Sequence, residues 1–300
     1  MIISASRRTD IPAFYSDWFY NRIRDGFVVT QNPFNANQLR KIDLDPGICD
    51  AIVFWTKNPE PMISRLDELD GFMYYFQFTL TPYDMSVEPG LPDKKALLGA
   101  FSRLSEKIGR KRVIWRYDPI LISDEFPAER HIDQFGKLAR ILSGQTEKVV
   151  ISFLDFYPSI MKRIAPLRAR EIRNEEIARV SSAFSRIARE NNMVVESCSE
   201  KIDLESFGIK HGKCVDGELI GELLGVPVDA GKDKNQRPDC GCVESIDIGA
   251  YNTCRHGCKY CYANFSEKAT ITNHGNHDPE SPLLTGRNQF PGNKKDGLGE

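Results

Sequence analysis

The feature that most constrains the fold is an alternation of short apolar segments and amphipathic segments along residues 1–200. Several apolar segments are nearly continuous runs of β-branched and aromatic residues, as in parallel strands buried on both faces. The segments between them carry apolar residues three and four positions apart, which is typical of helices. Such alternation predicts parallel βα units. The strand candidates are residues 1–6, 27–31, 51–56, 73–80, 112–116, 148–154 and 192–197.

An eighth strand candidate, residues 245–251, lies just before the last three cysteines. Eight strands predict an α/β fold in the form of a closed, TIM-like βα barrel. An open, doubly wound sheet is the alternative. We expect residues 1–197 to form the barrel body and residues 198–265 to be a cysteine-rich region that completes it. Residues 266–300, rich in Asn, Gly, Pro and His, predict an irregular tail.

Composition narrows the functional classes. Forty basic and 42 acidic residues give a net charge of −2, which excludes the strongly basic signature of a dedicated DNA-binding domain. The chain has no run of 18 apolar residues, so we expect no transmembrane helix and no membrane partner. Its first residues lack the order of a signal peptide, which predicts a cytoplasmic location. In that compartment, cysteines are metal ligands or redox groups more often than disulfides.

Polar residues follow the ends of the predicted strands. Arg8 and Asp10 follow the first strand, Arg116 and Asp118 stand at the end of the fifth, and Asp155 follows the sixth. Catalysis in a βα barrel takes place at these carboxyl ends. Arginines there can bind a carboxylate or phosphate, and the aspartates can bind ribose hydroxyls or an amino group. Asn-Pro and Asp-Pro are also ordinary turn dipeptides, but their recurrence at strand ends predicts a shared polar pocket.

Seven of the eight cysteines fall within residues 198–261, and the last three form the pattern CxxxCxxC in CRHGCKYCYAN. Three thiolates within eight residues can surround one small metal centre. Three protein ligands suit a cubane iron–sulfur cluster with one iron left open to a small molecule. The alternative is a zinc ion, for which His256 would supply the fourth ligand.

This segment resembles the cluster loop of the radical S-adenosylmethionine (SAM) superfamily, most closely the form found in spore photoproduct lyase-like members. The resemblance implies that Cys254, Cys258 and Cys261 bind a [4Fe–4S] cluster whose open iron chelates SAM. It also implies one-electron cleavage of SAM to a 5′-deoxyadenosyl radical, and a reductant such as flavodoxin or ferredoxin. Tyr260 would pack near the adenine.

The whole chain, over about residues 1–265, also resembles an uncharacterised family of microbial proteins known only as a domain of unknown function. The resemblance rests on segments spread along the chain and implies no substrate. These segments are SASRRTDIPAFY, FWTKNP, WRYDPI, SFLDFY, KDKNQRPDCGC and DIGAYNTCRHGCKYCYAN.

The position of the cysteine motif departs from the radical SAM pattern, in which the cluster loop follows the first strand. A circular permutation would reconcile the two, because the termini of such folds lie close together. Residues 245–251 would then act as the usual first strand and residues 1–6 as the second. The chain lacks the Gly-Gly-Glu-like segment that contacts the methionyl amine of SAM in the superfamily. By position, Arg8 and Asp10 would take its place.

Four further cysteines precede the motif: Cys198, Cys214, Cys240 and Cys242. Four ligands make a closed site, which can hold an auxiliary [4Fe–4S] cluster or a structural zinc. The spacing leaves both open, and the neighbouring iron–sulfur motif favours the cluster. Cys49 stands alone and is interpreted as a core residue.

These observations favour a radical SAM enzyme that abstracts a hydrogen atom from its substrate. One alternative is a zinc-stabilised, non-catalytic binding or regulatory barrel protein. Another is an electron-transfer protein with two clusters and no SAM site. The loop resemblance suggests nucleic-acid repair, but the near-neutral charge does not favour a duplex-binding surface. A small polar or phosphorylated molecule, a nucleotide or a peptide suits the pocket equally well.

Overall fold

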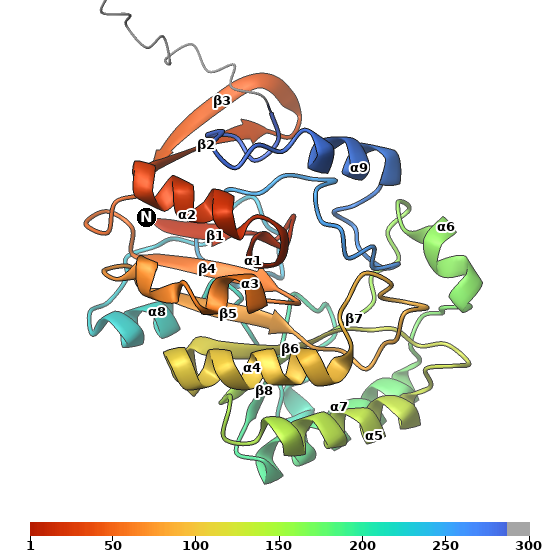
Figure 1. The fold of residues 1–300 in the computed structure, drawn as a ribbon. Coiled ribbons are helices and arrows are strands. Elements are labelled where there is room, and N and C mark those ends of the chain that lie inside the picture. The colour runs from red at the N-terminus through yellow and green to blue at the C-terminus, as the bar shows by residue number, and fades with distance from the viewer. Residues whose placement is uncertain (287–300) are drawn as a thin grey trace, which may run out of the picture.

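An eight-stranded parallel sheet forms the centre of the protein (Figure 1). The structure, a computed structural model, describes residues 1–286, apart from the side chain of residue 36. The strands follow the order β10-β1-β4-β5-β6-β7-β8-β9. Their bounds are β1 Ile2–Ala5, β4 Ala51–Thr56, β5 Tyr74–Thr79, β6 Val113–Ile120, β7 Lys148–Phe153, β8 Val194–Ser197, β9 Lys210–His211 and β10 Ile246–Asp247.

The sheet is open, so the predicted closed barrel is not confirmed. Within the described residues, no pairing joins the edge strands β9 and β10, each of which has two residues. From β1 to β9 the order follows the sequence without reversal, which also differs from a doubly wound sheet. The predicted strand near the C-terminus does lie beside the N-terminal strand. Ile246 of β10 pairs in parallel with Ile3 of β1.

Helices and their apolar side chains cover one face of the sheet. The predicted helical faces are confirmed, since Leu97, Phe101 and Leu104 of α4 are buried against this face. Phe135 of α5 stacks on Phe184 of α7 with ring centroids 3.8 Å apart. The helices are α1 Ile11–Phe14, α2 Ser16–Asp25, α3 Glu60–Ile63, α4 Lys94–Ile108, α5 Ala128–Leu142, α6 Met161–Ile164, α7 Asn174–Glu190, α8 Gly217–Leu224 and α9 Glu267–Gly275, with short 3₁₀ turns η1 Leu66–Leu69, η2 Arg110–Arg112, η3 Ala165–Leu167 and η4 Glu205–Phe207.

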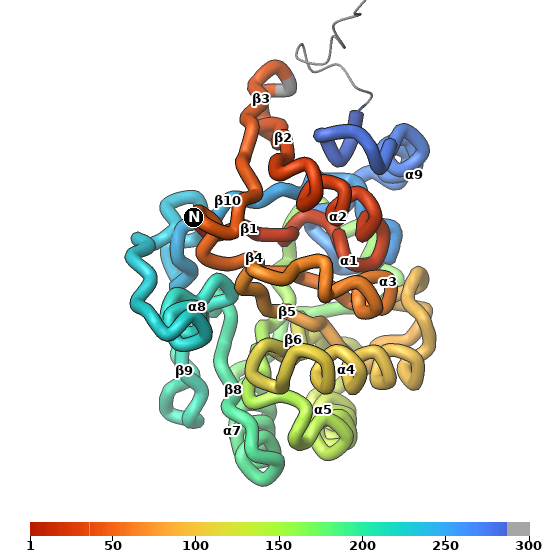
Figure 2. Tube along the Cα trace, turned by 60° about the vertical axis from the view of Figure 1, so that its left-hand side comes forward, coloured from red at the N-terminus to blue at the C-terminus, as the bar shows by residue number. Residues whose placement is uncertain are grey.

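The segment between β9 and β10 covers the other face of the sheet. Residues 214–242, with helix α8, pack against inward-facing side chains of β1, β4, β5, β6 and β7. The Tyr75 hydroxyl and the Gln77 amide of β5 donate to the carbonyl oxygen of Cys214, at 2.6 and 3.0 Å. In Figure 2, α8 lies on the opposite side of the strands from α4. This face of the sheet therefore buries Cys214, Cys240 and Cys242.

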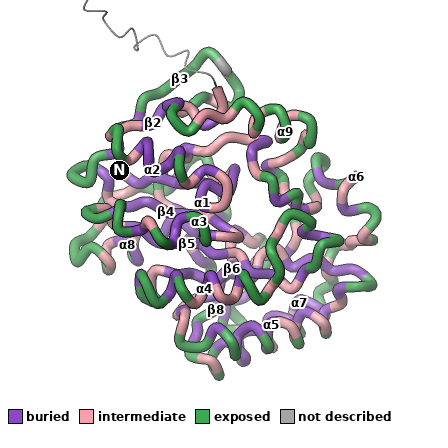
Figure 3. The backbone as a smooth tube through the Cα atoms, in the orientation of Figure 1, coloured by how far each residue is buried: buried purple, intermediate pink, exposed green. Residues whose placement is uncertain are grey.

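One predicted strand lies outside the sheet. Residues 27–31 fall in β2 (Phe27–Asn32), which pairs in antiparallel with β3 (Asn35–Asp43) as a separate hairpin. A two-residue turn of Pro33 and Phe34 connects the two strands, and such a turn permits only an antiparallel partner. Figure 3 shows the hairpin as a largely exposed projection above the buried strands.

The last described residues return to the body. Residues 267–275 form α9, so this part of the predicted tail is helical rather than irregular. Leu284 is buried in the main core, and the backbone N–H of Val29 donates to the carbonyl oxygen of Pro282 at 2.9 Å. The rest of the predicted tail, residues 287–300, lies outside the described residues. Residues 1–286 contain no helix of the length and apolar character that a membrane span requires.

Candidate functional site

The carboxyl ends of the central strands open into one cavity of about 300 Å³. Its walls bring together many of the polar residues at the strand ends and the seven cysteines of residues 198–261. Among the lining residues are Arg8, Asp10, Arg116, Asp118, Asp155, Tyr260, Cys198, Cys214, Cys240, Cys242, Cys254, Cys258 and Cys261. The predicted shared polar pocket is therefore present, and the central cavity, as we call it, is our candidate active site.

The three last cysteines lie on a loop, residues 252–265, that we call the cysteine loop. Asn252 closes its base, because the side-chain oxygen accepts from the backbone N–H groups of Phe265 and Ser266 at 2.9 and 3.0 Å. The side chain of Asn264 donates to the carbonyl oxygen of Cys254 at 2.8 Å. The loop is thus held at both ends, which presents its three thiols to one wall of the cavity.

A glycine allows the cysteine loop to lie close to a neighbouring loop. The backbone N–H of Gly90 donates to the carbonyl oxygen of His256 at 2.9 Å. A Cβ atom on Gly90 would lie 2.7 Å from the carbonyl oxygens of both Arg255 and His256. A larger residue here would therefore displace the backbone between Cys254 and Cys258.

His256 anchors the loop through its ring nitrogens. Its Nε2 lies 2.7 Å from Oδ2 of Asp10, and its Nδ1 lies 3.4 Å from the carbonyl oxygen of Gly90. Both ring nitrogens are occupied by protein oxygens, so His256 does not supply the fourth ligand of the zinc alternative. The Asp10 carboxylate also accepts from the backbone N–H groups of Lys57 and Ala13, at 2.7 and 3.0 Å. Asp10 lines the cavity but chiefly ties β1, β4 and the cysteine loop together.

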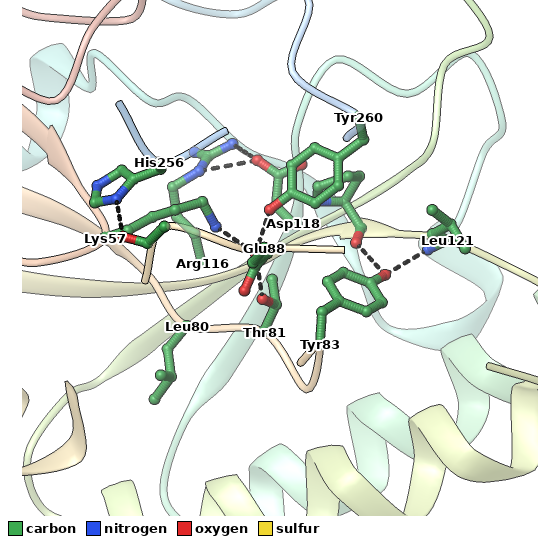
Figure 4. Close-up of polar contacts among 12 residues, drawn as sticks. Lys57, Leu80, Thr81, Tyr83, Glu88, Arg116, Asp118, Leu121, His256 and Tyr260 are labelled. Carbon is green, nitrogen blue, oxygen red and sulfur yellow. Dashed lines mark hydrogen bonds and ion pairs between the residues drawn. The ribbon is translucent and has the colours of Figure 1, made fainter. Parts of the chain in front are cut away.

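The buried carboxylate of Glu88 binds several side chains beside the cysteine loop. As Figure 4 shows, Lys57, Thr81 and Tyr260 converge on Glu88. Lys57 Nζ lies 2.8 Å from Oε1 of Glu88, and Lys94 Nζ lies 3.0 Å from Oε2. Burial alone would raise the pKa of Glu88, but the two ammonium groups lower it to about 2. Glu88 is therefore ionised and fixes the Tyr260 hydroxyl, while Lys57 lies 5.5 Å from the centre of the tyrosine ring.

Burial disfavours the thiolate form of two cysteines of the loop, Cys254 and Cys258. Burial raises the pKa of Cys258 to about 12, even though Lys57 acts in the opposite direction. Burial and the neighbouring Asp10 carboxylate raise the pKa of Cys254 well above its ordinary value. A metal that binds here must displace these protons, so its affinity would rise with pH.

The other four cysteines form a connected cluster, the four-cysteine group. Cys198 Sγ and Cys214 Sγ lie 3.1 Å apart, and Cys242 hydrogen-bonds with both Cys214 and Cys240. These thiols come from the end of β8, from the loop after β9 and from the segment before β10. All eight cysteines of the chain are free thiols.

Two arginines give the four-cysteine group an electropositive surrounding. Nη1 of Arg116 donates to Sγ of Cys214 at 2.8 Å. The hydrogen bond from Cys214, together with Arg116, lowers the pKa of Cys198 to about 7. Hydrogen bonds from Cys214 and Cys240, with Arg7 nearby, also lower the pKa of Cys242. The thiolate state is thus favoured at Cys198 and Cys242, while their thiol partners Cys214 and Cys240 have raised pKa values and stay protonated.

The remaining predicted residues form ion pairs around the cavity. Arg116 pairs with Asp118, which also accepts from the Ser152 hydroxyl. Burial would raise the pKa of Asp118, but Arg116 and this hydroxyl lower it. Asp155 pairs with Arg237 at 2.6 Å. Arg8 also lines the cavity, and its guanidinium lies 5.1 Å from the centre of the Tyr251 ring.

Four further residues matter here: Arg7 and Lys57 line the cavity, and Glu88 and Gly90 hold the cysteine loop from outside. Arg7 and Lys57 stand at strand ends within SASRRTD and FWTKNP, so their position was a usable signal. Glu88 and Gly90 lie in the irregular segment between β5 and α4 and have no periodic pattern. No sequence signal we know of would have paired them with Lys57 and His256.

The sulfur atoms do not surround a single ion. Within residues 1–286, no three His, Cys, Asp or Glu side chains are arranged to hold one metal ion. A cubane cluster makes a different demand, because each cysteine binds a separate iron atom at the corner of a bulky core. The cavity beside both sets of cysteines provides space for such a core.

A family model described as Domain of unknown function (DUF1848) matches residues 2–263. The chain belongs to this family. The range that matches DUF1848 includes all seven cysteines of the cavity and ends before α9. No curated protein matches the chain.

Proposed function

We propose that this DUF1848 protein is a radical SAM enzyme that removes a hydrogen atom from its substrate. The observation that supports this most strongly is that the CxxxCxxC loop and the polar strand ends share one cavity. When bound by Cys254, Cys258 and Cys261, a [4Fe–4S] cluster would supply the electron that cleaves SAM to a 5′-deoxyadenosyl radical.

The donor set of the cysteine loop fits a cluster with one open iron. Its three thiols line the cavity, and Cys258 is buried. His256, the other metal-ligating side chain between the outer cysteines, is turned to Asp10. The loop therefore offers three ligands rather than four, which leaves a place for a small molecule.

Several side chains can hold SAM beside the loop. The Tyr260 ring is fixed through Glu88 and offers a flat apolar surface for adenine. Arg8 offers a guanidinium for the carboxylate of SAM, and Asp155 offers an acceptor for hydroxyl or amino groups. Asp10 acts through His256, since its own oxygens accept from the protein.

The strand order supports the permuted arrangement. β10 leads directly into the cysteine loop and lies beside β1, so β10 takes the place of the usual first strand and β1 that of the second. Asp247 of β10 fixes this junction, because it accepts from Ser6 Oγ at 2.6 Å and from the backbone N–H of Arg7 at 2.9 Å. The polar residues after β1 are thereby held at the edge of the cavity.

The test is reductive cleavage of SAM by the full chain, purified without oxygen and reduced with dithionite. We expect 5′-deoxyadenosine from the wild type and none from the combined variant Cys254→Ala, Cys258→Ala, Cys261→Ala. Cys49→Ala is the matched control, because Cys49 is buried in the opposite core and should leave cleavage unchanged. A folded wild type that contains zinc instead of iron, or contains iron but never cleaves SAM, would contradict the proposal.

A further inference from the structure

We propose that Cys198, Cys214, Cys240 and Cys242 bind a second [4Fe–4S] cluster, and that Arg7 and Arg116 offset its negative charge. The proposal is independent of SAM cleavage, because it depends on a separate set of ligands. It adds a redox centre to the cavity. This centre lies on the wall that the sheet and residues 214–242 form.

Proximity of the four thiols is the first argument. They come from positions 198 to 242, yet three sulfur–sulfur contacts connect them, and the sulfurs of Cys198 and Cys214 lie 3.1 Å apart. No disulfide joins them, so all four thiols are available as ligands. Four cysteine ligands are the usual complement of a closed cubane cluster.

The position of the four thiols suits a cluster. Three sulfur–sulfur contacts connect them in a chain along one wall of the cavity. All four line the central cavity, so they border a space that can receive a cubane core.

The surrounding donors form the third argument. A cubane with four thiolate ligands carries net negative charge, and hydrogen bonds to its sulfurs help to set its potential. Arg116 already donates to Cys214, and the backbone N–H of Val215 donates to Cys242 at 3.3 Å. Arg7 lies near Cys242, and its Nη2 is buried without a hydrogen-bond partner in the described structure. A cluster sulfur would satisfy that nitrogen.

The first experiment measures iron, sulfide and zinc in the combined Cys254→Ala, Cys258→Ala, Cys261→Ala variant, which leaves only the four-cysteine group. We expect about four irons and four sulfides per chain in the oxygen-free protein. Adding Cys240→Ala and Cys242→Ala should remove them. Zinc in place of iron, or a folded variant with no metal, would overturn the proposal. Because this variant cannot cleave SAM under either hypothesis, the result is separate from the proposed function.

A second measurement stays informative if the five-fold cysteine variant does not fold. In the three-cysteine variant, Arg7→Gln should lower the midpoint potential of the remaining cluster while the iron content stays the same, because a positive charge beside it is lost. Arg7→Lys should recover part of the shift. Arg103→Gln is the control. Arg103 lies on the surface of α4, where it pairs with Glu60 of α3, so its loss should leave the midpoint potential unchanged. Equal potentials for Arg7→Gln and the control would contradict the charge-compensating role of Arg7.

Discussion

The two groups of cysteines are built in opposite ways. The cysteine loop carries its thiols within eight residues, and its neighbours Asp10, Glu88 and Gly90 hold the loop from outside. The four-cysteine group gathers thiols from three distant segments and lies within an apolar cluster on one face of the sheet. The fold only has to position the cysteine loop. The four-cysteine group, in contrast, helps to join residues 214–242 to the sheet.

This difference teaches what each group contributes. Loss of the cluster proposed for the cysteine loop should remove chemistry and leave the fold intact. Loss of the proposed second cluster should loosen the fold, because metal binding to a site assembled from distant segments is coupled to folding. Electrostatics differ as well, since burial raises the pKa of Cys258 in the loop, while hydrogen bonds and the nearby Arg116 lower the pKa of Cys198 in the other group.

The largest expected loss of stability comes from changes to the four-cysteine group. The variant Cys240→Ala, Cys242→Ala should lose more than about 3 kcal/mol of unfolding free energy, since it removes two buried side chains and a metal. The combined variant of the three loop cysteines should lose less. Denaturant unfolding without oxygen measures both. Equal losses would mean that the two groups play the same structural part.

Glu88→Gln should have the next largest effect. It leaves Lys57 and Lys94 without their buried counter-charge, which costs about 3–5 kcal/mol. Because the folded pKa of about 2 lies below the ordinary 4.5, ionised Glu88 stabilises the protein above pH 4.5. That stabilisation fades as the pH falls toward 2, so the gap between variant and wild type should narrow over this range.

The matched control for Glu88 is Glu60→Gln. Glu60 is half exposed and pairs with Arg103 on the surface, so its loss should cost less than about 1 kcal/mol. Glu88→Gln should also reduce the iron of the cysteine loop more than the iron of the four-cysteine group. A uniform loss of iron from both would show that Glu88 serves the whole fold.

Gly90→Ala tests the close backbone contact between Gly90 and the cysteine loop. The added methyl group would meet the carbonyl oxygens of Arg255 and His256, so we expect a loss of about 1–3 kcal/mol. SAM cleavage should fall, while the metal of the four-cysteine group is retained. Gly275→Ala in α9, where a Cβ meets nothing within 4 Å, is the control. Full SAM cleavage by Gly90→Ala would show that the close approach is unnecessary.

Asn264→Ala should have the smallest effect. It removes one hydrogen bond to the carbonyl oxygen of Cys254, worth about 1 kcal/mol. Iron of the cysteine loop should be lost faster to a chelator, with no change at the other group. The rates of iron loss from the separate sites measure this, and an unchanged rate at the loop would argue against Asn264 as a clamp.

Much of this architecture could be predicted from the sequence. Apolar runs such as residues 51–56 identified the sheet strands, and the strand ends identified Arg116, Asp118 and Asp155 as cavity residues. Whether the sheet closes into a barrel could not be predicted, because one face of the sheet is covered by residues 214–242, whose packing has no sequence pattern. The hairpin of β2 and β3 was missed because β2 has the apolar residues of a sheet strand, while its partner β3 is mostly polar.

The site shows the same limit. The cysteine loop could be predicted because its ligands are adjacent in the sequence. The roles of His256 and Asp10 could not, because each is defined by a partner 246 residues away. The sequence left His256 open as a zinc ligand, and the hydrogen bond to Asp10 assigns it to positioning instead.

The most direct test of the proposed radical SAM activity is the electron paramagnetic resonance spectrum of the reduced full chain, recorded with and without SAM. If the cysteine loop holds a cluster with an open iron, SAM should change the signal of the wild type. The combined variant Cys254→Ala, Cys258→Ala, Cys261→Ala should then retain only a signal that SAM leaves unchanged. A wild-type signal that is insensitive to SAM, in a protein with full iron and sulfide, would contradict an open SAM-binding cluster.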